Sequence, residues 1–366
     1  MRYMNGIRFF FAMATAISLV TACSGAGSKA IPPVGSTLAA PGGNGSAHPL
    51  AGAPPASPGV GELIGIFTRS KGAPVSPRLS NLPDWFPRSV AVLYVSGATC
   101  ACVLVYLQRG TDQAPVAMLT GMSDARGLFV DEAGDLYVGN SLADTVPIYR
   151  AGSLRTPIKT LTDPGNHPSD ITREGNHGTI YVVNQNTDGQ GPGSISVYAH
   201  GSTTPTSYLY THPNTFLDSI ALDAQHNLFA GYGDPEGVAQ IDEFQYKSVR
   251  PQPIQLPTEL GYTGGMEIDD MHHLLVADPD FNGQNAPAVD ILAIEQRVPL
   301  FKFDEEGWPY YVALNKIERH VYVSDARLSQ VREYTYPGGV LIDTITKGME
   351  NGNYPVGVAV AHPAPL

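Results

Sequence analysis

The sequence has 366 residues, of which 43% are hydrophobic and only 15% are charged, while glycine (39) and proline (31) are abundant. This composition suits short strands joined by many turns and argues against a protein built from helices with charged faces. The formal net charge is −12, and it becomes −14 once Arg2 and Arg8 leave with the N-terminal signal. Such an acidic chain repels phosphate backbones, so we expect no nucleic-acid partner.

The N-terminus has the pattern of an export signal. Arg2 and Arg8 precede an apolar run from Phe9 to Ala22, which is too short to span a bilayer of about 30 Å but is typical of a secretory signal. The run ends in Leu19-Val20-Thr21-Ala22-Cys23, which resembles the lipobox of bacterial lipoproteins. The resemblance implies that residues 1–22 are removed and that Cys23 is lipid-modified. The chain would then be exported and held at the bacterial cell envelope by its acyl chains, at the outer membrane if the cell has one. An ordinary signal peptide with a chance cysteine is the alternative.

Residues 23–82 read as a flexible tether. They are rich in glycine, proline, alanine and serine and lack the apolar density that would offset the entropy of ordering. One apolar island, residues 63–67, either packs on the following domain or belongs to the free linker. We assign residues 83–366 to that domain.

A short strand pattern recurs six times from Leu93 onward, and its spacing predicts the fold. The second residues of the six copies are 43, 44, 48, 46 and 47 positions apart, a period typical of propeller blades. Every copy except the first follows another apolar strand by 9 or 10 positions, so each pair is expected to form a hairpin. A third strand and a looser fourth strand complete each unit. The copies span residues 93–96, 136–140, 180–184, 228–231, 274–278 and 321–325.

The first unit lacks its innermost strand, because residues 90–92 run into Leu93 without room for a turn. The segment Pro355-Val356-Gly357-Val358-Ala359-Val360 has the innermost-strand pattern and can fill the place, which would close the ring and remove the free sheet edges. The sequence therefore predicts an all-β, six-bladed β-propeller closed by a C-terminal strand that completes the first blade.

The repeat resembles propellers of the NHL-repeat and gluconolactonase-like type. The strand Gly127-Leu128-Phe129-Val130-Asp131 and the strand Val321-Tyr322-Val323-Ser324-Asp325 carry the likeness, which extends from Leu93 to Ala361. This fold hosts hydrolases, lyases and binding modules alike. In similar hydrolases, one metal lies over the central tunnel, held by residues just before the glycine of several innermost strands. The corresponding residues in this chain are Arg126, Ser169, Asp218, Gly264, Tyr310 and Val356.

Only Asp218 among these six could bind a hard cation, and one carboxylate beside an arginine does not satisfy an ion that needs six or more oxygens. The enzyme hypothesis is a metal-dependent hydrolase of the lactonase or esterase type, or a lyase, with Asp218, His167 and His212 near the tunnel mouth. Turn chemistry repeated between blades also explains His167-Pro168 and His212-Pro213. No Gly-x-Ser-x-Gly, His-Glu-x-x-His or phosphate-loop motif occurs.

The connections between second and third strands are longer in three consecutive blades and emerge on one face. Two of them place oxygen side chains at positions 1, 3 and 5 with glycine at 6, the spacing by which calcium loops wrap an ion. These are Asn184, Asn186 and Asp188 in one loop, and Asp278, Asp280 and Asn282 in the other. No acidic residue stands at position 12, which excludes a helix-loop-helix calcium hand. We predict calcium in at least one loop; ordinary turn formation is the alternative.

Cys100 and Cys102 lie two positions apart in the first blade. They are either partly buried thiols or a bridge of unusual geometry formed in an exported compartment.

The sequence favours a binding or scaffold module over an enzyme. We expect the face with the three long loops to recognise a protein, a glycan or a small ligand, with membrane contact through the lipid anchor only. A third hypothesis is a structural assembly module of the envelope, which would form a stable complex and bind no small ligand.

Overall fold

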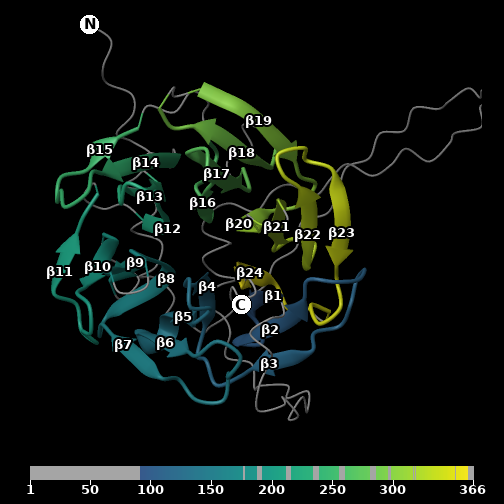
Figure 1. Cartoon of the computed structure of the whole chain (residues 1–366), viewed down its shortest axis with the longest axis horizontal. Helices are drawn as coiled ribbons and strands as arrows, with labels where there is room; N and C mark the ends of the chain where they lie inside the picture. Colours follow the sequence, from purple (N-terminus) through teal and green to yellow (C-terminus); the bar gives the residue numbers. More distant parts are fainter. Residues whose placement is uncertain are drawn as a thin grey trace, which may run out of the picture. The chain divides into compact units, whose positions relative to one another are not determined.

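The computed structural model describes residues 91–361 apart from 176–177, 188–191, 212–215, 234–238, 255–259, 281–285, 296–297, 316, 318 and 351. It confirms the all-β prediction. Six four-stranded antiparallel sheets are arranged as blades around a central axis, which makes a six-bladed β-propeller (Figure 1). The predicted signal, Cys23 and the tether lie outside the described residues. Within the described ranges, no helix is long and apolar enough to cross a membrane.

Each blade contains four strands, which follow one another from the axis outward. Blade 1 is β24 (Pro355–Ala361), β1 (Val92–Gly97), β2 (Cys102–Leu107) and β3 (Ala117–Leu119). Blade 2 is β4 (Ala125–Val130), β5 (Leu136–Asn140), β6 (Thr145–Tyr149) and β7 (Lys159–Thr162), with a short 3-10 helix η2 (Ser141–Ala143). Blade 3 is β8 (Asn166–Arg173), β9 (Ile180–Thr187), β10 (Ser194–Tyr198) and β11 (Ser207–Leu209).

The other three blades have the same order. Blade 4 is β12 (Phe216–Leu222), β13 (Leu228–Gly233), β14 (Ala239–Phe244) and β15 (Gln252–Pro253). Blade 5 is β16 (Met266–Ile268), β17 (His273–Asp278), β18 (Ala288–Ala293) and β19 (Val298–Asp304). Blade 6 is β20 (Pro309–Asn315), β21 (His320–Asp325), β22 (Gln330–Thr335) and β23 (Leu341–Ile345).

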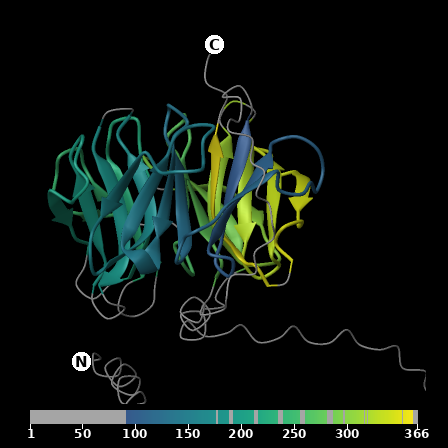
Figure 2. The ribbon, with the colours of Figure 1, turned by 90° about the horizontal axis from the view of Figure 1, so that it is seen from below.

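The strands run between two faces of the propeller, as the side view shows (Figure 2). We call one the turn face, because it carries the tight turns between the first and second strands of each blade. The other, the loop face, carries the connections between second and third strands and the entry into each blade. Blades pack face to face, so the inner strands are buried on both sides. This explains why β1 and β5 are buried along their whole length and read as apolar runs rather than alternating patterns.

The ring closes as the sequence predicts. β24 pairs antiparallel with β1, with Val92 opposite Ala361 and Val95 opposite Val358. β24 also contacts β4 of blade 2 and β20 of blade 6. The last strand of the described chain thus completes the first blade and joins it to both neighbours.

Aspartates that directly follow three of the first strands connect neighbouring blades. Within its own turn, each carboxylate accepts backbone N–H groups, such as those of Ala133 and Asp135 at Asp131, at 3.0 and 2.9 Å. The second oxygen of each then accepts a hydrogen bond or an ion pair from the next blade. The three inter-blade pairs are Asp131 with Arg173, Asp223 with His272, and Asp269 with Tyr336. The repeated residue therefore both shapes the turn and holds two blades together.

The two cysteines of blade 1 form a disulfide. Cys102 begins β2, and Cys100 lies in the preceding turn, where Ala101 has a φ of 47°. The Cα atoms are 5.1 Å apart, within the usual range for a bridge. Of the two alternatives that the sequence left open, the structure has the bridge.

Candidate functional site

The tunnel does not run open through the propeller, because Tyr311 lies across it. Its hydroxyl is 2.9 Å from the carbonyl oxygen of Ser169 in blade 3 and 3.1 Å from that of Asp218 in blade 4. The neighbouring first strands also approach closely at this level. A Cβ atom at Gly127 would lie 2.2 Å from the Ser169 carbonyl oxygen, so only glycine fits. The tyrosine separates a polar layer toward the loop face from a cavity toward the turn face.

The polar layer contains the residues that the family resemblance singled out. Arg126 donates to Asp124 at 2.8 Å and to Gln185 at 3.1 Å, and Gln185 in turn donates to Asp218 at 2.9 Å. Tyr262 donates a hydrogen bond to the second oxygen of Asp218. Asp218 is 4% exposed, and burial raises its pKa to about 6 although Tyr262, Gln185 and Arg126 each oppose the shift. The carboxylate is therefore fixed inside a buried network.

This network makes stability depend on pH through Asp218. The folded protein holds the Asp218 proton more tightly than the unfolded chain, since the pKa is about 6 against an ordinary 3.8. The stability that the proton confers is fully present below about pH 4 and is lost as the pH rises through 6, a loss on the order of 3 kcal/mol. We expect Asp218→Asn to remove this loss, so that its unfolding free energy relative to the native sequence rises between pH 4 and 8.

Asp269→Asn is the matched control, because hydrogen bonds from Tyr336 and the His273 backbone outweigh burial and lower the pKa of Asp269. A lowered pKa gives stability that is lost as the pH falls, so this variant must change in the opposite direction. Urea unfolding of the three proteins from pH 3 to 8 measures both slopes. Parallel curves for Asp218→Asn and the native sequence would contradict the assignment.

His167 does not join Asp218 in any contact of the described residues. It lies in β8, and its Nδ1 is 3.2 Å from the carbonyl oxygen of Ser141 and 3.3 Å from a carboxylate oxygen of Asp144, both in blade 2. His212 lies outside the described residues. His167 thus helps to join blades 2 and 3. Of the three residues in the enzyme hypothesis, the structure therefore places only Asp218 in the polar layer of the tunnel, together with its hydrogen-bonding partners.

The two predicted calcium loops differ in their first residues. The oxygens of Asp278 accept the backbone N–H groups of Gly261, Tyr262 and Asp280 at 2.8 to 2.9 Å, and burial raises the pKa of Asp278 to about 6. Asn184 donates from Nδ2 to Ser194 and Ser196, and its Oδ1 has no hydrogen-bond partner among the described residues.

The remaining calcium residues are described only in part. Asp280 is buried, while Asp188, Asn282 and the side chain of Asn186 lie outside what the structure describes. Calcium binding stays a prediction. Of the residues at position 1 of the two loops, Asn184 is the one whose side-chain oxygen accepts no hydrogen bond from the described residues. Across the described ranges, no group of three or more His, Cys, Asp or Glu side chains is placed to hold a metal.

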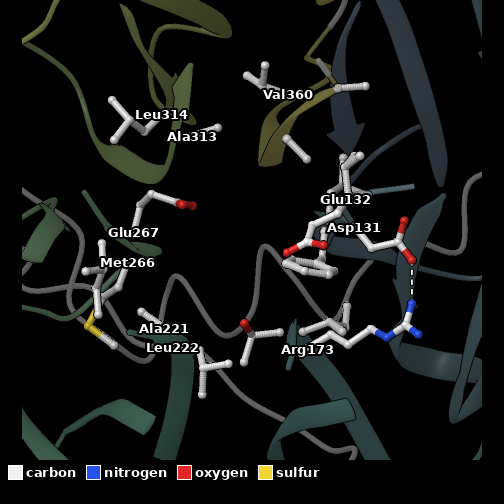
Figure 3. Close-up of a pocket in the computed structure, with 18 of the residues that line it drawn as sticks. Asp131, Glu132, Arg173, Ala221, Leu222, Met266, Glu267, Ala313, Leu314 and Val360 are labelled. Carbon is white, nitrogen blue, oxygen red and sulfur yellow. Dashed lines mark hydrogen bonds and ion pairs between the residues drawn. The ribbon is translucent and has the colours of Figure 1, made fainter. Parts of the chain in front are cut away.

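A cavity of about 920 Å³ occupies the tunnel on the turn-face side of Tyr311. We call it the cup. Its wall is built from the first strands of all six blades, and much of it is apolar, with Val130, Leu222 and Val360 only partly buried where they meet the cavity. Figure 3 shows the side chains that project into it. A concave, partly apolar space with a few polar groups is the usual form of a small-ligand site.

The cup is strongly acidic. Among the described residues that line it are seven carboxylates, one arginine and two histidines: Asp131, Glu132, Asp170, Asp223, Glu267, Asp269, Asp270, Arg173, His226 and His272. Asp131, Asp223 and Asp269 are the aspartates that also join neighbouring blades. Asp170 lies near the floor, where the backbone N–H groups of Ile171 and Ile220 donate to it at 2.9 and 3.0 Å. Burial raises the pKa of Asp170 well above its ordinary value.

Sequence reasoning pointed to the loop face and missed the cup. One signal was available: Tyr311 stands at the repeat position that Gly127, Gly265 and Gly357 fill in three other blades. A large side chain at a position where three other blades have glycine marks a place where the tunnel is obstructed. The charge of the cup has no comparable signal, because the acidic side chains come from several blades and a linear pattern does not show which of them meet at the axis.

No protein-family model matches the sequence, and no curated protein matches it significantly. Solved structures with a similar fold are known. A chain in the crystal structure of a nidogen/laminin complex superposes with a TM-score of 0.56 at 13% identity, covering 74% of this chain and 98% of that one. Hydrazine synthase of Kuenenia stuttgartiensis gives 0.52 at 16% identity, covering 75% and 90%. At these identities the likeness shows the β-propeller architecture alone.

Proposed function

We propose that this protein is a binding propeller tethered to the bacterial cell envelope through Cys23, and that it holds a small ligand in the cup. The observation that carries the proposal is a cavity of about 920 Å³ closed at one end by Tyr311 and open toward the turn face. A fixed wall of paired strands favours binding, because little entropy is lost when the ligand enters a preformed site. The resemblance of the repeat to the NHL type, a fold that hosts binding modules among others, also favours this function.

The loop face is the alternative surface, and its partner would be a protein or a glycan. The segments that would form it, including 188–191, 234–238 and 281–285, lie outside the described residues. The cup is therefore the better supported site. The hydrolase hypothesis is supported less, because the described partners of Asp218 are Tyr262 and Gln185 rather than a second acid, base or nucleophile.

Blocking the cup tests the proposal. Leu222→Trp places a large ring on a partly buried position of the wall, and Val360→Trp does the same from β24. Ile342→Trp, at a position 45% exposed on the outer strand β23, is the control. We expect ligand-detected NMR with a panel of small ammonium, carboxylate, sugar and alcohol compounds to find binding that both wall variants abolish and the control keeps. Absence of any binding, or binding that folded wall variants retain, would contradict the proposal.

A further inference from the structure

We infer that the ligand of the cup is an organic cation with an extended apolar body, of the alkyl diamine or polyamine class, bound between Glu132 and Glu267. This inference rests on the proposed function and names the chemical class of its ligand. Three properties of the cup favour such a ligand: the placement of these two glutamates, the balance of charge, and the apolar wall between the acidic groups.

The two glutamates face each other across the cavity. Glu267 lies in β16 of blade 5, and Glu132 follows β4 of blade 2. Blades 2 and 5 lie on opposite sides of the axis (Figure 1). Figure 3 shows both side chains projecting into the cavity from opposite walls. A ligand with a positive group at each end can therefore meet a carboxylate at both, whereas a ligand with one charge can meet only one.

Among the described residues that line the cup, basic side chains are fewer than carboxylates. The guanidinium of Arg173 is turned aside to Asp131, with the Nη1 atom 2.5 Å from a carboxylate oxygen (Figure 3). The imidazole of His272 lies 3.0 Å from a carboxylate oxygen of Asp223. The described side chains that line the cup therefore carry more negative than positive charge, and a low-dielectric wall concentrates the field that this charge produces.

The spread of the acidic groups favours an organic cation over a metal ion. A divalent metal needs several oxygens around one point, and the described residues contain no such group of three or more ligands. Between the acidic positions the wall presents carbon, at Val130, Leu222 and Val360. Methylene groups can contact these side chains while the ammonium ends donate charge-assisted hydrogen bonds to carboxylates.

Titration calorimetry of the purified full chain tests the inference. The probes are spermidine, its shorter relative putrescine, the uncharged 1,4-butanediol, and calcium chloride alone. The variants are Glu132→Gln, Glu267→Gln and the double variant, with Glu306→Gln as control because that side chain is 89% exposed and outside the cup. We expect spermidine to bind and butanediol not to bind. Each cup substitution should weaken spermidine binding roughly tenfold, the double variant should weaken it further, and the control should not.

The outcomes separate the inference from the proposed function. If a sugar, carboxylate or alcohol binds in the cup and Leu222→Trp blocks it while spermidine does not bind, the cup is a binding site and the cationic class is wrong. Spermidine binding that the double variant leaves unchanged also overturns the inference. Calcium binding that Glu267→Gln removes, without spermidine binding, would identify an inorganic cation instead.

Discussion

Val358→Asp is expected to unfold the propeller or to lower its unfolding free energy by more than about 4 kcal/mol. Val358 is 3% exposed in the closing strand β24 and packs with Val95 and Val356 in the core between blades 1 and 6. The substitution forfeits the burial of a valine, about 1.5 to 3 kcal/mol, and places a carboxylate among apolar side chains. Since small domains have only about 5 to 15 kcal/mol in total, the loss is severe. Urea unfolding followed by circular dichroism measures it.

Ile342→Asp is the matched control for this effect. It makes the same kind of change on a strand of blade 6, but at a position 45% exposed on the outer edge. We expect a change within about 1 kcal/mol, as for most exposed sites. A chain ending at Asn353, which lacks β24 altogether, should show no cooperative transition. Equal effects of the two aspartate substitutions would mean that the closing strand is not essential to the ring.

Asp131→Ala should cost about 3 to 5 kcal/mol, because it removes the carboxylate partner of Arg173 between blades 2 and 3. The two side chains are 3% and 11% exposed. The same carboxylate accepts two backbone N–H groups in its turn and the Tyr137 hydroxyl at 3.2 Å. Thermal and urea unfolding of the variant measure the loss.

The neighbouring Glu132→Ala is the control, since Glu132 is exposed at the rim of the cup. It should change stability little. Asp131→Asn should fall between the two, because the amide oxygen can still accept the turn N–H groups. Adding Arg173→Met to Asp131→Ala should recover part of the loss, since a buried charge without its carboxylate is then removed. If the double variant is as unstable as the sum of both single variants, the ion pair is not the source of the effect.

Much of the fold follows from the sequence, because inner strands of packed blades are apolar on both sides. The segments expected at 136–140 and 355–360 match β5 and β24 to within one residue. Counting 9 or 10 positions back from the second strands gives starts that are too late in most blades. The difference is largest in blades 3 and 4, where this count gives Asp170 and Ser219 but β8 begins at Asn166 and β12 at Phe216. Register shifts at Pro168/Asp170 and Leu217/Ser219 interrupt the pairing there. Bulges break the alternation on which sequence reasoning depends.

The candidate site was less accessible from the sequence. The repeat predicts that Asp218 stands just before a first strand of the tunnel, and the structure places it in the buried polar layer with Gln185 and Tyr262. Its partner Tyr262 precedes the first strand of the next blade, and the obstruction by Tyr311 comes from blade 6. A linear pattern does not say which of these side chains reaches across the axis. The opposition of Glu132 and Glu267 has the same origin, since it depends on two blades that are not neighbours.

The borrowed strand β24 also determines the order in which the ring can assemble and open. Its pairing with β1 joins positions as distant as Val92 and Ala361, so blade 1 completes only after almost the whole described chain is present. A permuted chain with Pro355–Ala361 placed before β1 would contain the same blades, each made of consecutive strands. The native contacts would be unchanged, but pairing within blade 1 would no longer join the two ends of the chain. In the natural order, the seam between blades 1 and 2 or 6 cannot part unless blade 1 itself unzips, so the arrangement slows unfolding more than it raises equilibrium stability.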